Sequence, residues 1–181
     1  MTDRIRLAHT ADLSPDELTA ARALLDDAFE GDFADEDWDH GLGGMHVLIH
    51  DAAGLAAHGS VVMRRVRHAG RWLRTGYVEA VAVRADVRRT GLGGRVMAAL
   101  ERVIERAYDL GALAASEDGA LLYTARGWRQ WAGQVHALSP EQGIVRLRDD
   151  EGFVYVWPPT LAKALDPAGV LVFDWRDGDV T

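Results

Sequence analysis

The chain has 181 residues, 48% of them apolar and 27% charged, which is typical of one soluble globular domain, and we expect a single domain over residues 1–181. It contains no cysteine, which excludes a disulfide framework, a thiolate metal site and a cysteine nucleophile. The net charge of −8 argues against nucleic acid as a partner. Because no long apolar segment or signal sequence is present, we expect no membrane partner and a cytoplasmic location.

Charge is unevenly distributed along the chain. Eight acids and no Lys or Arg lie between Asp26 and Asp39, and further acids cluster at 149–151 and 174–179. In contrast, eleven arginines and four acids lie between Arg64 and Arg106. Solvated surfaces are the simpler explanation of such runs. The alternative is a protein with two substrates, an anion that meets the basic middle and a cation that meets the acidic ends.

The first half of the chain predicts strands and helices in alternation. Residues 4–9 alternate between apolar and polar and predict a strand. Ser14 and Glu17 form a capping box around Pro15, which predicts a helix to about Phe29. The elements expected next are a short helix near 35–40 and strands at 45–49, 55–67 and 74–84, with turns at 51–54 and 69–70.

The second half predicts a long amphipathic helix from Gly91 to about Tyr108, because apolar residues recur on one helical face. We expect a buried strand at 111–115 and a short helix at 117–125 that Gly127 ends. Residues 128–138 and 153–157 predict a closing antiparallel pair of strands, and 158–181 an irregular tail.

The most specific local motif is a glycine-rich turn between a predicted strand and the long helix. Such a turn presents backbone N–H groups at a helix N-terminus, where the helix dipole also favours an anion. The motif lacks the Gly-Lys-Ser/Thr end of a Walker A loop, and Val96 stands where a dinucleotide fingerprint needs glycine. A plain strand-to-helix connection is the alternative. The residues expected to bind a phosphate are Arg88, Arg89, Thr90, Gly91, Leu92, Gly93 and Gly94.

This Arg-x-x-Gly-x-Gly motif, with the order of predicted elements around it, resembles the pyrophosphate loop of the GCN5-related N-acetyltransferases (GNAT). The resemblance implies an α+β (α/β) GNAT fold, with a central mixed, mostly antiparallel twisted sheet flanked by helices and splayed where the cofactor inserts. It implies acetyl-CoA as the acetyl donor and no metal. It further implies that the backbone of Val81, Ala82 and Val83 pairs with the pantetheine arm like an added strand.

Further runs between Asp32 and Asp179 resemble the aminoglycoside 2'-N-acetyltransferases of that superfamily. The most specific are Leu42-Gly43-Gly44-Met45-His46 and Gly76-Tyr77-Val78-Glu79. The resemblance implies transfer of the acetyl group to the 2'-amine of aminoglycoside antibiotics by direct attack in a ternary complex. Antibiotic resistance would be the consequence.

A lone carboxylate, Glu79, interrupts an otherwise apolar strand. Strand alternation places it on one face with Val81 and Val83, and apolar neighbours make a carboxylate a better base. An amine arrives protonated at neutral pH, so a base must remove a proton before it attacks. The resemblance assigns this role to Glu79, acting through water, and substrate contacts to Glu79 and Ala80. A solvent-facing carboxylate on an edge strand is the alternative.

Two further catalytic roles come from the resemblance. A backbone N–H near Val81 would polarise the thioester carbonyl, and the phenol of Tyr123 would protonate the leaving thiolate. The alternative for Tyr123 is a core side chain, because Leu121 and Leu122 beside it are also apolar.

The acids are the expected binding site for a polycationic amine, since several carboxylates can hold it by charge-assisted hydrogen bonds. By the resemblance, the ligands are Asp32, Asp37, Asp150 and Asp179 together with Glu79. Relatives tend to end in tryptophan, whereas this chain ends in Thr181, which would alter a wall of the sugar pocket. The histidines lack zinc-binding spacing, and we interpret His46 and His50 as packing or surface side chains.

Two other functions remain open at this point. One is a GNAT enzyme that acetylates a polyamine, peptide or cell-wall amine, because the acidic clusters suit any polycation. The other is a non-catalytic sensor that binds CoA or a cation, although a sensor needs neither the acid nor the base. A homodimer, formed through the C-terminal strands, is a further expectation.

Overall fold

The computed structural model describes residues 4–157 and 165–181. Its contacts divide the chain into two compact units, and each is described by itself. The N-terminal unit is Met1–Val62 with Val78–Val103, and the C-terminal unit is Met63–Tyr77 with Ile104–Thr181. The single domain over 1–181 stays a prediction.

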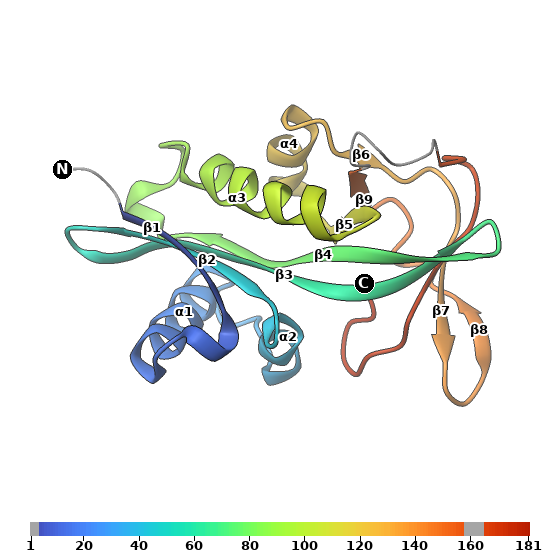
Figure 1. Cartoon of the computed structure of the whole chain (residues 1–181), viewed down its shortest axis with the longest axis horizontal. Coiled ribbons are helices and arrows are strands. Elements are labelled where there is room, and N and C mark those ends of the chain that lie inside the picture. The colour runs from blue at the N-terminus through green and yellow to red at the C-terminus, as the bar shows by residue number, and fades with distance from the viewer. Residues whose placement is uncertain (1–3, 158–164) are drawn as a thin grey trace. The chain divides into compact units, whose positions relative to one another are not determined.

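The N-terminal unit is a sheet with helices on both faces. It holds β1 (Arg4–His9), β2 (Met45–Asp51), the first part of β3 (Gly54–His68) and the second part of β4 (Arg71–Val83). β2 lies antiparallel between β1 and β3. Helices α1 (Pro15–Ala28) and α2 (Asp35–Gly41) lie on one side of these strands and α3 (Leu92–Ala107) on the other (Figure 1). Two single-turn 3-10 helices, η1 (Thr10–Asp12) and η2 (Ala85–Val87), connect these elements.

Local sequence explains how these helices begin and pack. The capping box is formed in full, because Ser14 N donates to the Glu17 carboxylate at 2.9 Å and Glu17 N donates to Ser14 Oγ at 3.3 Å. Leu24 and Leu25 of α1 pack with Ala82 of β4. On the other face, a Cβ at Gly59 would lie 2.6 Å from Val96 Cγ1, so the glycine permits the close approach of α3.

The C-terminal unit adds strands on both sides of its parts of β3 and β4. β5 (Leu110–Ala114) is parallel to β4, and β9 (Val154–Trp157) lies antiparallel between β5 and β6 (Arg129–Gln130). β10 (Leu171–Phe173) is antiparallel to β3, β7 (Val135–Ser139) is parallel to β10, and β8 (Gly143–Arg146) is antiparallel to β7. The short helix α4 (Glu117–Ala125) follows β5. The largest buried side chains of this unit include Trp128, Tyr77 and Phe173.

The mixed and mostly antiparallel strand pairing is confirmed, as are the predicted helices and the strands before residue 128 to within a few residues. The registered pairs of β4 with β5 end at Tyr77 and Ala112, and Glu79 to Val83 follow that last pair along β4. Among the helices of the described chain, none is both long and apolar enough to cross a membrane.

Two predictions near the C-terminus are wrong. Residues 128–138 do not pair as one strand with 153–157: within that range β6 pairs antiparallel with β9, as expected, whereas β7 pairs with β8 and β10. The chain turns away at Gly133, where a Cβ would lie 1.9 Å from the Gly169 carbonyl oxygen. The tail is not wholly irregular, since Leu171–Phe173 is a buried strand, while residues 158–164 lie outside the described residues.

Candidate functional site

The glycine-rich turn lies directly before α3 in the N-terminal unit. Arg89 and Gly91 adopt left-handed backbone conformations, with φ of 63° and 92°, and α3 begins at Leu92. The first N–H groups of an α-helix have no carbonyl partner within it, so the N–H groups that open α3 are donors for an anion. The local geometry therefore fits a phosphate-binding turn.

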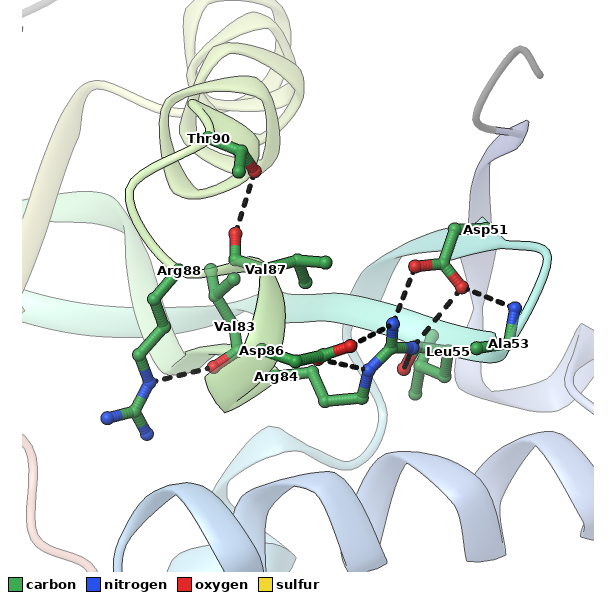
Figure 2. A network of polar contacts seen from close by, with 9 residues as sticks. All are labelled: Asp51, Ala53, Leu55, Val83, Arg84, Asp86, Val87, Arg88 and Thr90. Carbon is green, nitrogen blue, oxygen red and sulfur yellow. Dashed lines mark hydrogen bonds and ion pairs between the residues drawn. The ribbon is translucent and has the colours of Figure 1, made fainter.

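The arginines around this turn divide into two kinds. Arg84 donates to Asp51 at 2.6 Å and to Asp86 at 2.7 Å, and its hydrogen bonds to Asp86 and Asp51 raise its pKa (Figure 2). It fixes the end of β4 to the turn before β3. Arg88 is exposed and uses Nε to bind the Val83 carbonyl at 3.2 Å, while its other nitrogens point away from this network (Figure 2). Arg88 and Arg89, which is also exposed, are the cations suited to a phosphate.

The glycines of the turn serve different purposes. A Cβ at Gly91 would meet no atom within 4 Å, so its left-handed φ, rather than lack of space in the protein, favours glycine. Gly93 and Gly94 lie in the first turn of α3, and Thr90 Oγ1 donates to the Val87 carbonyl at 2.7 Å, which steadies the chain before the helix. Phosphate binding by these residues stays a prediction.

A break in the backbone of β4 lies beside Glu79. Ala80 has a φ of 51°, a conformation that costs a non-glycine residue about 1–3 kcal/mol and that recurs at functional sites. Side chains of β3 contact the carbonyls here: His58 Nδ1 lies 3.2 Å from the Ala80 oxygen, and Ser60 Oγ lies 3.5 Å from the Glu79 oxygen.

The alternation expected for Glu79, Val81 and Val83 is interrupted between Glu79 and Val81, because Ala80 adopts a left-handed conformation. A Cβ on Gly59 would face α3 and would lie 3.2 Å from Val81 Cγ2, so Val81 points toward α3. Ala82, in contrast, is buried against α1. Glu79, Ala80, Val81 and Val83 are half-buried. Their roles with donor and acceptor stay predictions.

Tyr123 lies on α4 in the C-terminal unit and is 8% exposed. Its ring contacts Trp128 and Tyr155, with centroids 6.2 and 6.4 Å away, and burial raises its pKa to about 12. The phenol therefore keeps its proton at neutral pH. These contacts suit a core tyrosine and a proton donor equally well.

The two acids predicted for the acceptor in the N-terminal unit lie in different settings. The Asp37 carboxylate accepts from Ala34 N at 2.8 Å and so caps α2, whereas Asp32 is exposed in the connection between α1 and α2. Part of the acidic run is neutralised, because Arg22 pairs with Asp26 at 2.8 Å and with Asp35 at 2.9 Å.

The two acids predicted in the C-terminal unit are brought together. Burial raises the pKa of Asp150, a hydrogen bond from the Thr181 side chain opposes this shift, and the charges of Asp179 and Asp149 add to it. Asp150, Asp179 and the end of the chain thus form one cluster.

Arg64, which sequence reasoning missed, holds the tail that carries this cluster. Its side chain is 5% exposed and donates to the Asp174 carboxylate at 2.8 Å and to the Asp174 and Val180 carbonyls. The guanidinium also lies 4.9 Å from the ring centre of Tyr77 and 5.3 Å from that of Phe173. Several arginines lie close together in this part of β3, and the sequence does not indicate that Arg64 is the buried one.

Comparison with known proteins decides the family. An acetyltransferase (GNAT) domain model matches residues 9–131. An aminoglycoside 2'-N-acetyltransferase of Mycolicibacterium fortuitum is 46% identical over 177 residues, which cover 97% of this chain and 90% of that protein. The chain belongs to the GNAT acetyltransferase family. It is therefore an acetyltransferase, and the resemblance seen in its motifs is confirmed.

Solved structures confirm the GNAT fold. A GNAT family N-acetyltransferase of Escherichia coli in complex with CoA has a TM-score of 0.64 and 20% identity, covering 94% of this chain and 89% of that one. A probable N-acyltransferase of Enterococcus faecalis V583 has a TM-score of 0.60 and 16% identity; 74% of this chain matches it, but only 34% of that protein is covered. This GNAT chain thus spans about a third of the longer protein.

Proposed function

We propose that this GNAT acetyltransferase transfers the acetyl group of acetyl-CoA to the 2'-amine of aminoglycoside antibiotics. The observation that carries the proposal is the 46% identity to an aminoglycoside 2'-N-acetyltransferase over 97% of the chain. The specific runs near Met45 and Glu79 add to it, because they lie apart from the glycine turn that acetyltransferases of this fold share.

The turn before α3 is the proposed binding site for the donor's pyrophosphate. Its support is the left-handed Gly91, the open N-terminus of α3 and the exposed Arg88 and Arg89. The backbone of Val81 to Val83 is the proposed partner of the pantetheine arm.

The proposed reaction is direct attack. Through a bound water, Glu79 takes a proton from the 2'-ammonium group, and the neutral amine attacks the thioester carbon. The carbon–sulfur bond then breaks to release CoA, and the nitrogen loses its second proton to water as the amide forms. The Val81 N–H stabilises the negative charge that develops on the thioester oxygen. The phenol of Tyr123, which burial keeps protonated at neutral pH, gives its proton to the leaving thiolate and regains one from water.

The proposed acceptor contacts are carboxylates, with Asp150 and Asp179 as one group and Asp32 and Asp37 as another. The cluster around Thr181 supports the first group, since its carboxyl groups lie close enough to affect one another. Asp37 contributes less in this proposal, because its carboxylate already caps α2.

Antibiotic resistance, a cytoplasmic location and a homodimer remain parts of the proposal. Resistance follows if acetylation removes a positive charge that the antibiotic needs. Light scattering of the purified protein would give twice the monomer mass for a homodimer, and the monomer mass would contradict it.

A pair of kanamycin-type compounds tests the acceptor. One carries a 2'-amine and the other a 2'-hydroxyl, and thiol release from acetyl-CoA is measured with each. We expect turnover with the amine and little with the hydroxyl, which is a weaker nucleophile. Equal turnover would contradict the 2' assignment, and turnover only with polyamines or peptides would identify the alternative acceptor class.

A further inference from the structure

A chain of hydrogen bonds crosses the sheet of the N-terminal unit and ends at the left-handed residue of β4. Thr10 Oγ1 lies 2.8 Å from His46 Nε2, His46 Nδ1 lies 3.0 Å from His58 Nε2, and His58 Nδ1 lies 3.2 Å from the Ala80 carbonyl oxygen. Each histidine is 1% exposed. These contacts join η1, β2, β3 and β4, and we call the four residues the histidine relay.

The proton positions in the relay follow from its last member. A carbonyl oxygen only accepts, so His58 carries its proton on Nδ1 and its Nε2 must accept. His46 then donates from Nδ1 and accepts at Nε2 from the hydroxyl of Thr10. That hydroxyl also accepts from Gly43 N at 2.9 Å and lies 3.2 Å from the Gly44 carbonyl, a longer contact than the one to His46. Each ring is thus a neutral imidazole in one defined tautomer.

Burial agrees with this assignment. It is the largest cause that lowers the pKa of His58 to about 3 and that of His46 to about 4, and the charge of the neighbouring ring or of His9 adds to it. Both rings are therefore uncharged near pH 7. Apolar side chains could fill this buried site without needing hydrogen-bond partners, whereas two imidazoles need them. Packing alone therefore does not explain why histidines occupy it.

Peptide geometry connects the relay to the reaction. The Ala80 carbonyl and the Val81 N–H belong to one planar trans peptide, so they point in opposite directions. A donor that holds the carbonyl oxygen from the β3 side therefore also fixes the direction of the Val81 N–H. This matters most here because the left-handed φ of Ala80 is a conformation that the chain adopts only when its surroundings hold it.

We propose that His58 is a positioning residue for acetyl transfer: held in one tautomer by His46, it fixes the Ala80 carbonyl and thereby aims the Val81 N–H at the thioester oxygen. The inference rests on the proposed function for the role of that N–H. The contact between His58 and the Ala80 carbonyl is observed in the structure and does not depend on that function.

Two amide replacements of His58 test the proposal. In asparagine the amide nitrogen takes nearly the place of Nδ1, so His58→Asn keeps the donor to Ala80. In glutamine the amide lies near the place of Nε2, so His58→Gln keeps the contact with His46 and loses that donor. We expect His58→Gln to lower kcat about 10- to 100-fold, toward the loss seen when an oxyanion donor is removed, with little change in the KM of acetyl-CoA. His58→Asn should stay within a few-fold of the wild type.

Amide hydrogen exchange supplies a readout apart from activity. The Val81 amide should exchange faster in His58→Gln than in His58→Asn or the wild type, measured without substrates. His50→Gln, in the same strand as His46, is the control and should change neither kcat nor Val81 exchange. Equal kcat and equal Val81 exchange in the two His58 variants would overturn the proposal.

A second pair keeps the test decisive if His58→Gln fails to fold. His46→Asn retains a donor to His58 Nε2, whereas His46→Leu removes it and leaves the His58 ring without the contact that holds it, so only His46→Leu should lower kcat. Similar kcat values for the two would overturn the role of the relay. A wild-type protein that acetylates no 2'-amine would contradict the proposed function alone, and the exchange comparison would still decide whether His58 holds the Ala80 peptide.

Discussion

The turn before α3 and the break at Ala80 both depend on left-handed backbone, and both lie in the N-terminal unit. In the turn, Gly91 adopts this conformation at little cost, and neighbouring arginines mark the site in the sequence. At Ala80 an ordinary residue adopts it, and a buried histidine holds its carbonyl. In the proposed function the two features have different roles: the turn binds the donor, and the break aligns the groups that react.

The largest expected effect lies at the break. Glu79→Gln keeps the size of the side chain and removes its basicity, so kcat should fall about 10²–10⁴-fold, measured by thiol release from pH 6 to 9. The KM of the amine should rise as well, because Glu79 also contacts it in the proposal. Near-normal turnover of the folded variant across this range would show that Glu79 is not the base.

The histidine relay should make the protein sensitive to acid. Burial lowers the pKa of His46 to about 4 and of His58 to about 3, whereas the unfolded chain has ordinary histidines near 6.5. The unfolded state therefore binds more protons below pH 6.5, and stability is lost as pH falls. We expect each histidine to cost about 1–2 kcal/mol of unfolding free energy between pH 7 and pH 5.

Urea unfolding at the two pH values measures this loss. A double variant, His46→Asn with His58→Asn, should lose less stability on acidification than the wild type does. Equal losses in the two proteins would mean that these buried rings do not carry the pH dependence.

A substitution in the glycine-rich turn should weaken the binding of acetyl-CoA rather than slow the chemical step. Gly93→Val places a branched side chain in the first turn of α3, and we expect the KM of acetyl-CoA to rise about tenfold or more, which corresponds to ~1.4 kcal/mol of binding. The KM of the amine should change much less. An unaltered affinity for acetyl-CoA would show that the turn does not bind the donor.

The smallest expected effect concerns the acids. Asp32→Asn combined with Asp150→Asn should raise the KM of a polycationic amine about three- to tenfold, because each partly exposed ion pair contributes about 0.2–1 kcal/mol. The KM of acetyl-CoA should stay unchanged. Glu105→Gln, an exposed acid on α3, is the control. Equal damage to both substrates would contradict separate donor and acceptor sites.

Sequence periodicity and capping were enough to predict most elements, since the signals of α1, α2, α3 and the central strands are local. The capping box and the glycine turn were predicted for the same reason. Strand β10 was not predicted, because a three-residue run such as Leu171–Phe173 carries little local signal. Most of β7 lies within the expected strand 128–138, but its partners depend on long-range pairing and were not predicted.

The histidine relay was hidden by strand register. β2 pairs with β3 as Asp51↔Gly54 and His50↔Leu55, but the register shifts between Ile49 and His50, so that Leu48 pairs with His58 and His46 with Ser60. Without that one-residue shift, His46 and His58 would lie on opposite faces of the sheet. Alanine at position 80 likewise carries no signal of a left-handed φ, and Arg64 meets Asp174 from 110 residues away.

The most direct test of the central claim is the position of the acetyl group on the product. An aminoglycoside with a 2'-amine and other free amines is incubated with acetyl-CoA and the enzyme, and the product is examined by NMR. The account predicts a single acetyl group, on the 2'-nitrogen. An acetyl group on another nitrogen, or no acetylated antibiotic at all, would contradict it.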